Sequence, residues 1–170
     1  MATQPGTATL PAATQIGHVH LKVADLDRSL AFWRDVIGFE VTQLYGRQAA
    51  FLSAGGYHHH LGLNTWESHG GGAPTPGSTG LYHVAVLLPT REALAVVLHR
   101  VLRAGVPLEG AADHGVSQAI YLRDPDGNGV ELYWDYPASQ WPRDRQGRLA
   151  MVTEPLDLAA LLALAPAEAV

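Results

Sequence analysis

One order of secondary structure is predicted twice along this chain, and that repeat limits the folds that it can adopt. A strand, an amphipathic helix and three short strands are predicted over residues 15–66 and again over residues 81–137. One helix covers only one face of such a small sheet. Pairing the two units lets their uncovered faces curve together around a shared cavity. We therefore predict an α+β fold in which two paired βαβββ modules form a curved mixed sheet around a cavity.

The first module opens with a strand over Gly17–Val23, where apolar and polar residues alternate. The helix after it begins at the N-cap candidate Asp25 and ends at Gly38, with apolar residues at helical spacing between them. Three short strands are predicted to follow, at Phe39–Tyr45, Ala49–Ser53 and Tyr57–Trp66.

The second module repeats this order with different residues. A strand over Leu81–Leu88 precedes a helix over Arg91–Ala104, which Gly105 ends. The remaining strands are predicted at Pro107–Glu109, Ala119–Arg123 and Gly129–Trp134. The turn residues of Asp124–Gly129 separate the last two of these strands.

Composition divides the rest of the chain. Residues 1–14 are rich in Ala, Thr and Pro and are predicted to be a flexible tail, and the Gly/Pro-rich residues 67–80 are predicted to be a linker. Residues 138–170 form a C-terminal extension, with a short helix predicted over Asp157–Ala165. We expect the two modules to form one domain.

The composition also excludes several kinds of chemistry. The chain has 170 residues and no cysteine, so disulfides, thiolate metal sites and a cysteine nucleophile are excluded. A net charge of -5 without a Lys/Arg cluster argues against nucleic acid and membrane surfaces as partners. We find no apolar run long enough to cross a bilayer and no signal-peptide pattern, and we therefore expect a cytoplasmic protein.

Three potential metal ligands occupy comparable places in the two modules. His18 lies on the first strand with His20 and Lys22 on the same face, and His83 lies near the start of the corresponding strand of the second module. Glu131 lies on the last strand. Any one of these is more often an ordinary polar residue of a strand. Their equivalent places in a repeated unit favour a convergent site, and therefore a metal within the cavity.

Several other candidate side chains also have an interpretation that involves no function. His58, His59 and His60 could be a solvated strand start, and His114 an exposed turn residue. Tyr121 could be a packed aromatic residue. We interpret His69 and His99 as surface residues.

Two segments of the chain resemble the vicinal oxygen chelate superfamily, which includes glyoxalase I, bleomycin-resistance proteins, fosfomycin-resistance enzymes and type I extradiol dioxygenases. They read GHVHLKVADLDRSLAFWRDVIGFEV and IYLRDPDGNGVELYWD. The resemblance covers roughly Gly17 to Tyr136. The segments GGYHHHLGLNTW and ADHGVSQAIYLRDPDGNGVELY are similar to the catechol 2,3-dioxygenase branch.

The resemblance implies that His18, His83 and Glu131 bind one metal ion. Two histidines and one carboxylate are the usual ligands of non-haem Fe(II) oxygenases, which makes Fe(II) the expected cofactor, with Mn(II), Zn(II) or Ni(II) as alternatives. The open metal positions would take a catechol-type substrate and O2.

The resemblance also implies roles for four further residues. His59 matches the family's acid/base histidine, and His60 is the alternative if the register differs by one residue. Tyr121 stands ten residues before Glu131, where the family's tyrosine contacts the substrate. The family has a further histidine where this chain has Ala112, and we place the nearby His114, with His60, at the substrate.

We therefore expect an Fe(II)-dependent extradiol dioxygenase that forms a homodimer, with its modules paired within one chain or exchanged between two. A glyoxalase-like lyase or isomerase is an alternative that needs a fourth ligand among His58–His60. A binding protein of the bleomycin-resistance type is another, although complete ligand positions argue against it. Many extradiol dioxygenases carry four such modules, whereas this chain has two.

Overall fold

A computed structural model describes residues 9–166 and contains two separate sheets. The first sheet has the order β1-β4-β3-β2, and the second has the order β5-β8-β7-β6-β9. In each module the first strand pairs in parallel with the last strand, β1 with β4 and β5 with β8. The strands are β1 (Val19–Lys22), β2 (Glu40–Tyr45), β3 (Ala49–Ser53), β4 (Leu61–Asn64), β5 (Val84–Leu87), β6 (Leu108–Asp113), β7 (Ser117–Arg123), β8 (Gly129–Asp135) and β9 (Glu154–Pro155).

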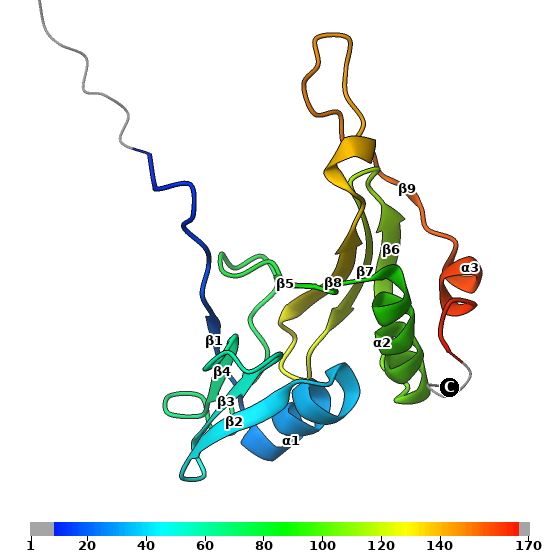
Figure 1. Ribbon diagram of the computed structural model, residues 1–170. Helices are drawn as coiled ribbons and strands as arrows, with labels where there is room; N and C mark the ends of the chain where they lie inside the picture. The colour runs from blue at the N-terminus through cyan, green and yellow to red at the C-terminus, as the bar shows by residue number, and fades with distance from the viewer. Residues whose placement is uncertain (1–8, 167–170) are drawn as a thin grey trace, which may run out of the picture.

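This arrangement confirms the predicted α+β class and the two βαβββ modules. Figure 1 shows the first sheet at the lower left and the second standing upright near the centre, with the helices beside them. The two sheets do not join into one, because β1 and β5 pair only with strands of their own module. His18 and His20 of the first module are exposed, whereas His83 and Glu131 of the second are partly buried.

The first helix begins and ends where the sequence predicts. The Asp25 side chain accepts a 2.9 Å hydrogen bond from the Arg28 amide and caps α1 (Leu26–Leu30). The helix continues as the π-helix η1 (Ala31–Ile37) and ends at Gly38, whose φ of 105° favours glycine. A Cβ there would also lie 2.6 Å from the Arg100 guanidinium.

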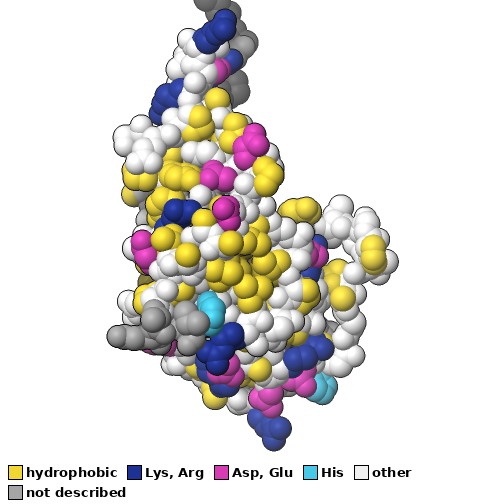
Figure 2. All heavy atoms as spheres, turned by 90° about the vertical axis from the view of Figure 1, so that its right-hand side faces the viewer, with side chains coloured by type: hydrophobic (Ala, Val, Ile, Leu, Met, Phe, Trp, Pro, Cys, Tyr) yellow, Lys and Arg dark blue, Asp and Glu magenta, His cyan; other side chains and the backbone are white. Residues whose placement is uncertain are grey.

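The other helices pack on this one or on each other. Thr90 caps α2 (Arg91–Arg103), and Asp157 caps α3 (Leu158–Leu162), a short helix in the predicted extension. A short 3-10 turn, η2 (Ala138–Gln140), follows β8. One core joins both modules, and its fully buried members include Trp33, Leu98, Val101, Ile120, Leu132 and Leu161. Figure 2 shows hydrophobic side chains gathered on the face of the molecule that carries α3.

The turn between β7 and β8 fastens the second module to the first. Asp124 shapes this turn by accepting hydrogen bonds from the amides of Asp126 at 3.0 Å and Asn128 at 2.8 Å. The buried Asp126 carboxylate reaches across and accepts from the Ala24 amide at 3.0 Å and the Ser29 hydroxyl at 3.1 Å. It also pairs with the Arg28 guanidinium. Asp126 therefore ties this turn to the end of β1 and the start of α1.

Several strand boundaries differ from the predicted ones. The last strand of the first module begins at Leu61, so that His58–His60 precede it. The reason is the turn at Gly55 and Gly56, which have φ values of 69° and 79° and delay the return to the sheet. β6 runs on to Asp113, and β9 pairs with its end, a pairing that the sequence did not predict.

Parts of the predicted tail and extension, residues 1–8 and 167–170, lie outside the described residues. Within residues 9–166, none of the helices has the length and apolar character that a bilayer span needs.

Candidate metal centre and substrate site

Two of the predicted metal ligands meet in the second module. His83 lies one residue ahead of β5, and Glu131 lies on the neighbouring strand β8. The His83 Nε2 atom is 2.9 Å from Glu131 Oε2. His83 Nδ1 is buried without a hydrogen-bond partner in the described structure, so the ring's polar contact is on its Glu131 side.

Tyr121 holds the other oxygen of Glu131. The two residues are direct partners in the β7–β8 ladder, and the Tyr121 hydroxyl donates a 3.1 Å hydrogen bond to Glu131 Oε1. Burial and the nearby Glu131 carboxylate raise the pKa of Tyr121 to about 12. Tyr121 is therefore a neutral donor over the whole physiological pH range.

His114 extends this chain of contacts. It lies in the β6–β7 turn, with Nε2 at 2.8 Å from the Tyr121 hydroxyl and Nδ1 at 3.0 Å from the Val152 carbonyl. The carbonyl can only accept, so Nδ1 carries a proton. His114 thus joins the Tyr121 hydroxyl on one side of its ring to the Val152 backbone on the other.

A glycine allows β5 to approach β8 at this point. A Cβ on Gly129 would lie 2.0 Å from the Tyr82 carbonyl oxygen and 3.0 Å from His83 Cβ. Beside it, a cavity of about 490 Å³ is lined in part by Tyr82, His83, Tyr121 and Arg123. The cavity thus opens directly onto a predicted ligand and the predicted substrate-contacting tyrosine.

The third predicted ligand belongs to a second group of side chains in the first module. The His18 ring lies 4.4 Å, centroid to centroid, from the ring of His59. His59 also packs against Phe51, and its Nδ1 lies 2.8 Å from His58 Nδ1. Burial, and then the proximity of His18 and His58, lower the pKa of His59. A neutral His59 able to accept a proton is therefore favoured.

His60 and His20 have other contacts. His60 Nδ1 lies 3.0 Å from the Ser53 hydroxyl, and the ring packs near Tyr57. The His20 ring packs near Trp66 and directly over Gly62, where a Cβ would lie 2.9 Å from the ring. Of the two neighbouring histidines proposed for acid/base chemistry, His59 is thus the one that the structure places against His18.

The structure does not bring the two groups together within one chain. Among residues 9–166, no three His, Cys, Asp or Glu side chains lie close enough to hold a metal ion jointly. The sequence had led us to expect that His18 meets His83 and Glu131. The structure does not bring these three side chains together within one chain.

The His83–Glu131 pair nevertheless fits a metal. Ligand atoms about 2.1 Å from a metal on neighbouring octahedral corners are about 3 Å apart. The observed separation of 2.9 Å agrees with that arrangement. Imidazole nitrogen and carboxylate oxygen are also suitable donors for Fe(II), Mn(II) and Zn(II).

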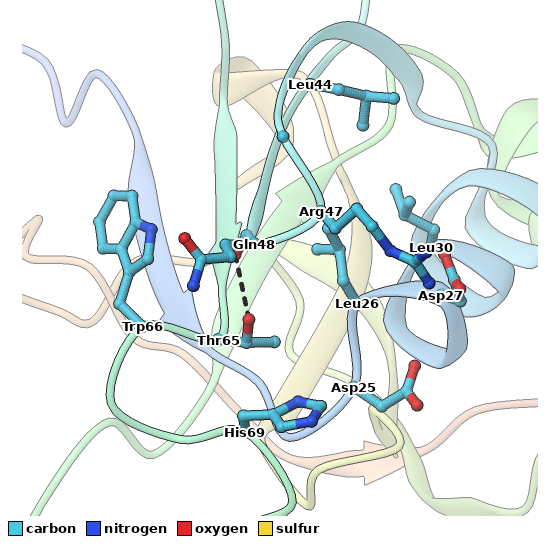
Figure 3. A pocket seen from close by; sticks show the side chains of 11 residues that line it. Asp25, Leu26, Asp27, Leu30, Leu44, Arg47, Gln48, Thr65, Trp66 and His69 are labelled. Carbon is cyan, nitrogen blue, oxygen red and sulfur yellow. Dashed lines mark hydrogen bonds between the residues drawn. The ribbon is translucent and has the colours of Figure 1, made fainter.

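A larger cavity of about 650 Å³ lies apart from both groups. Its lining includes Asp25, Arg47, Thr65, Trp66 and His69, at the start of α1 and the ends of β2 and β4 (Figure 3). None of the predicted site residues lines it. The larger of the two cavities therefore does not coincide with the predicted metal ligands.

Comparison with known proteins agrees with these features. A family model described as the Glyoxalase/Bleomycin resistance protein/Dioxygenase superfamily matches residues 15–132. A catechol-2,3-dioxygenase of Bacillus subtilis is 45% identical over 88% of this chain and 51% of its own. A biphenyl-2,3-diol 1,2-dioxygenase of Rhodococcus globerulus is 34% identical over 71% of this chain and 63% of its own.

A solved structure of lactoylglutathione lyase from Agrobacterium tumefaciens is also similar. It has a TM-score of 0.56 and 26% identity, over 73% of this chain and 96% of that one. The chain spans about half the length of the Bacillus relative and just under two thirds of the Rhodococcus relative.

Proposed function

The chain belongs to the glyoxalase, bleomycin resistance protein and dioxygenase superfamily, and on that premise we propose that it is an extradiol dioxygenase. Its substrate would be a catechol-type aromatic diol, which it cleaves with O2. The observation that carries the proposal is the contact chain His83–Glu131–Tyr121 beside a cavity. It joins two suitable metal ligands to a hydroxyl that can orient a substrate oxygen.

The proposed metal ligands are His18, His83 and Glu131. Fe(II) is the preferred ion because two histidines and a carboxylate are typical of non-haem Fe(II) oxygenases. Relatives of the chain include an iron-dependent and a manganese-dependent extradiol dioxygenase, which keeps Mn(II) as the alternative. When bound, the metal would lower the pKa of the diol and bring it together with O2.

The side chains around the metal would position the substrate and move its protons. Tyr121 would turn its hydroxyl proton from Glu131 to a substrate oxygen when the substrate binds, since its raised pKa keeps the hydroxyl protonated. His59 would accept a proton from a diol hydroxyl and return it during ring opening, because its lowered pKa favours the neutral ring. His114 would hold the Tyr121 hydroxyl in place at 2.8 Å.

A glyoxalase-like reaction is the second candidate. It needs a fourth protein ligand, and His59 stands next to His18 where it could provide one. The similarity to a lactoylglutathione lyase structure favours keeping this reading. In that reading His59 binds the metal, whereas in the dioxygenase reading it transfers protons.

One assay distinguishes the two reactions. The protein is loaded with Fe(II) under anaerobic conditions, mixed with catechol, and exposed to air. We expect a yellow ring-opened product and stoichiometric O2 uptake. Inactivity across several catechols, together with activity on the hemithioacetal of glutathione and methylglyoxal, would contradict the dioxygenase and support the lyase.

We also propose a homodimer. His18 is exposed and His83 is partly exposed, and each has a large exposed apolar side chain nearby: Trp66 packs beside His20, and Leu87 lies on the His83 side of β5. Size-exclusion chromatography with light scattering measures this directly.

A further inference from the structure

The cavity of about 490 Å³ holds a positive charge that the proposed reaction does not use. Among its described lining residues, Arg123 alone is a lysine or arginine. Arg123 lies on β7 two residues after Tyr121, so both side chains project from the same face of the strand. The pairing of β7 with β8 is regular here, because Tyr121 faces Glu131 and Arg123 faces Gly129.

The spacing of these two side chains suits a substituted benzene ring. Residues two apart on a strand are separated by about 6.6 Å along it. That distance is close to the length of a benzene ring that carries one substituent at each end. The cross-strand partners Gly110 on β6 and Gly129 on β8 add no side chain to this space. A ring whose hydroxyl meets Tyr121 is therefore long enough to reach Arg123 with the group at its far end.

The guanidinium of Arg123 is held in place and still has unused donors. Its Nε donates a 2.8 Å hydrogen bond to Glu109 Oε1, and its Nη1 donates one of 3.0 Å to the Gly127 carbonyl. An arginine has five N–H donors, so three remain, and the two on Nη2 have no partner among the described residues. Unused donors on a fixed planar group are suited to a carboxylate.

A β-bulge directs Glu109 toward this guanidinium. The register of β6 against β7 shifts between Leu108 and Gly110, which leaves Glu109 as the extra residue. Both members of the Glu109–Arg123 pair are about half exposed, so the pair contributes little to stability. A carboxylate that binds Arg123 would lie near Glu109 and be repelled by it. Glu109 therefore orients Arg123 and also limits its affinity for an anion.

We propose that Arg123 selects catechols that carry a carboxylate para to one of the two hydroxyls. One diol oxygen would meet Tyr121, and the carboxylate would accept hydrogen bonds from Arg123 Nη2. Tyr82, which lines the same cavity and is 82% exposed, would pack against the ring. The inference rests on the proposed function, because the metal site places the diol. It narrows the substrate class from aromatic diols in general to anionic ones.

Two compounds of nearly equal shape test this selection. The acid 3,4-dihydroxybenzoate and its amide differ in charge and little in size. Their kcat/KM values are measured by O2 uptake with the Fe(II)-loaded protein. The acid-to-amide ratio is then compared between wild type and variants, because this comparison cancels the different reactivity of the two rings. Arg123→Gln should lower the ratio about 10- to 100-fold, since a hydrogen bond between charged groups is lost.

Three further variants separate a charge effect from a structural one. Arg123→Lys keeps the charge without the planar group and should retain part of the preference for the acid. Glu109→Gln can still accept from Arg123 Nε but lacks the negative charge, so it should raise the ratio. Arg148→Gln is the matched control, because Arg148 pairs with Asp144 outside the cavity, and it should keep the wild-type ratio. Should Arg123→Gln fail to fold, Arg123→Lys and Glu109→Gln decide.

Binding is measured beside turnover, so that the selection and the reaction can fail separately. Anaerobic calorimetric titration with each compound gives affinities that do not depend on ring cleavage. Equal ratios in wild type and Arg123→Gln, or a lower ratio in Glu109→Gln, would overturn the inference and leave the dioxygenase intact. Arg123-dependent binding of the acid without cleavage of either compound would support the selection and contradict only the reaction. Wild type that binds neither compound would overturn both.

Discussion

Tyr121 and Glu131 face each other across β7 and β8, and the tyrosine hydroxyl donates a 3.1 Å hydrogen bond to Glu131 Oε1. The other carboxylate oxygen, Oε2, is left to face His83 Nε2 at 2.9 Å. One side chain thus fixes the rotation of the proposed metal-ligating carboxylate. Tyr121 also lines the cavity in which we propose that the substrate binds.

Removing this hydroxyl should slow turnover while the metal stays bound. Hydrogen bonds to charged groups contribute about 1.5–3 kcal/mol, so Tyr121→Phe should lower kcat by about 10- to 100-fold. Iron content measured by elemental analysis should remain near that of wild type. Unchanged kcat in Tyr121→Phe would remove the tyrosine from the proposed mechanism.

The raised pKa of Tyr121 predicts its titration in the metal-free protein. Because the pKa rises from 10.0 to about 12, the folded state retains a proton that the unfolded state loses between these values. The free energy of unfolding should therefore fall as the pH rises across this window. Ultraviolet titration of wild type minus Tyr121→Phe measures the group. A difference signal that titrates at pH 10 or below would contradict the burial and charge effects described above.

The two neighbouring histidines should respond differently to substitution. His59→Phe should bind metal and catechol nearly normally yet turn over about 10²- to 10⁴-fold more slowly, because general acid/base catalysis is lost. His60→Phe is the matched control, since its ring bonds to Ser53 and not to the His18 group. Steady-state kinetics of both variants decide whether His59 or His60 is the acid/base residue. Full turnover in His59→Phe with loss in His60→Phe would reverse the assignment.

A side chain at Gly129 should disturb the His83–Glu131 pair. Its Cβ would lie 2.0 Å from the Tyr82 carbonyl, so that β5 must shift away from β8. Overpacking of this kind costs about 1–3 kcal/mol of stability. We expect Gly129→Ala to bind metal more weakly and to melt earlier in calorimetry. Gly110→Ala is the control, because its Cβ meets Tyr121 Cδ2 only at an ordinary 3.9 Å. Equal effects of the two changes would argue against the close approach.

Asp126 should matter more for stability than its place in a turn suggests. Asp126→Ala leaves the Ala24 amide, the Ser29 hydroxyl and the half-exposed Arg28 without their shared acceptor. We expect a loss of about 2–3 kcal/mol in urea unfolding, below the usual cost for a fully buried pair. Asp35→Ala removes an exposed ion pair with Arg34 and should cost far less. Equal losses of unfolding free energy in the two variants would mean that Asp126 does not stabilise the contact between the modules.

Local patterns predicted the elements of this fold well. Asp25 and Gly38 bound the first helix as expected, since capping and positive φ depend on neighbouring residues. Strand alternation likewise placed His18 and His83 at the openings of the two modules. Their separation could not be predicted, because periodicity does not report how two sheets sit relative to each other.

The finer assignments needed tertiary contacts. The His60 ring contacts the Ser53 hydroxyl on β3, a contact that the spacing of the histidines does not predict. The contact of His114 with Tyr121 depends on the β6–β7 turn, although the nearness of the two residues in sequence was a usable signal. Asp126 looked like a turn residue, and its partners lie about 100 positions away in the chain, at sequence separations of 97 to 102. No local pattern could have shown that pairing.

Metal content tests the central claim most directly. Wild type, His83→Ala, Glu131→Ala and the control His20→Ala are loaded with Fe(II) under anaerobic conditions, desalted and measured by elemental analysis. His20 shares the strand face of His18 but is not a proposed ligand. We predict about one iron per chain in wild type and in His20→Ala, and loss of most of it in the two ligand variants. Full iron retention in Glu131→Ala would contradict the account.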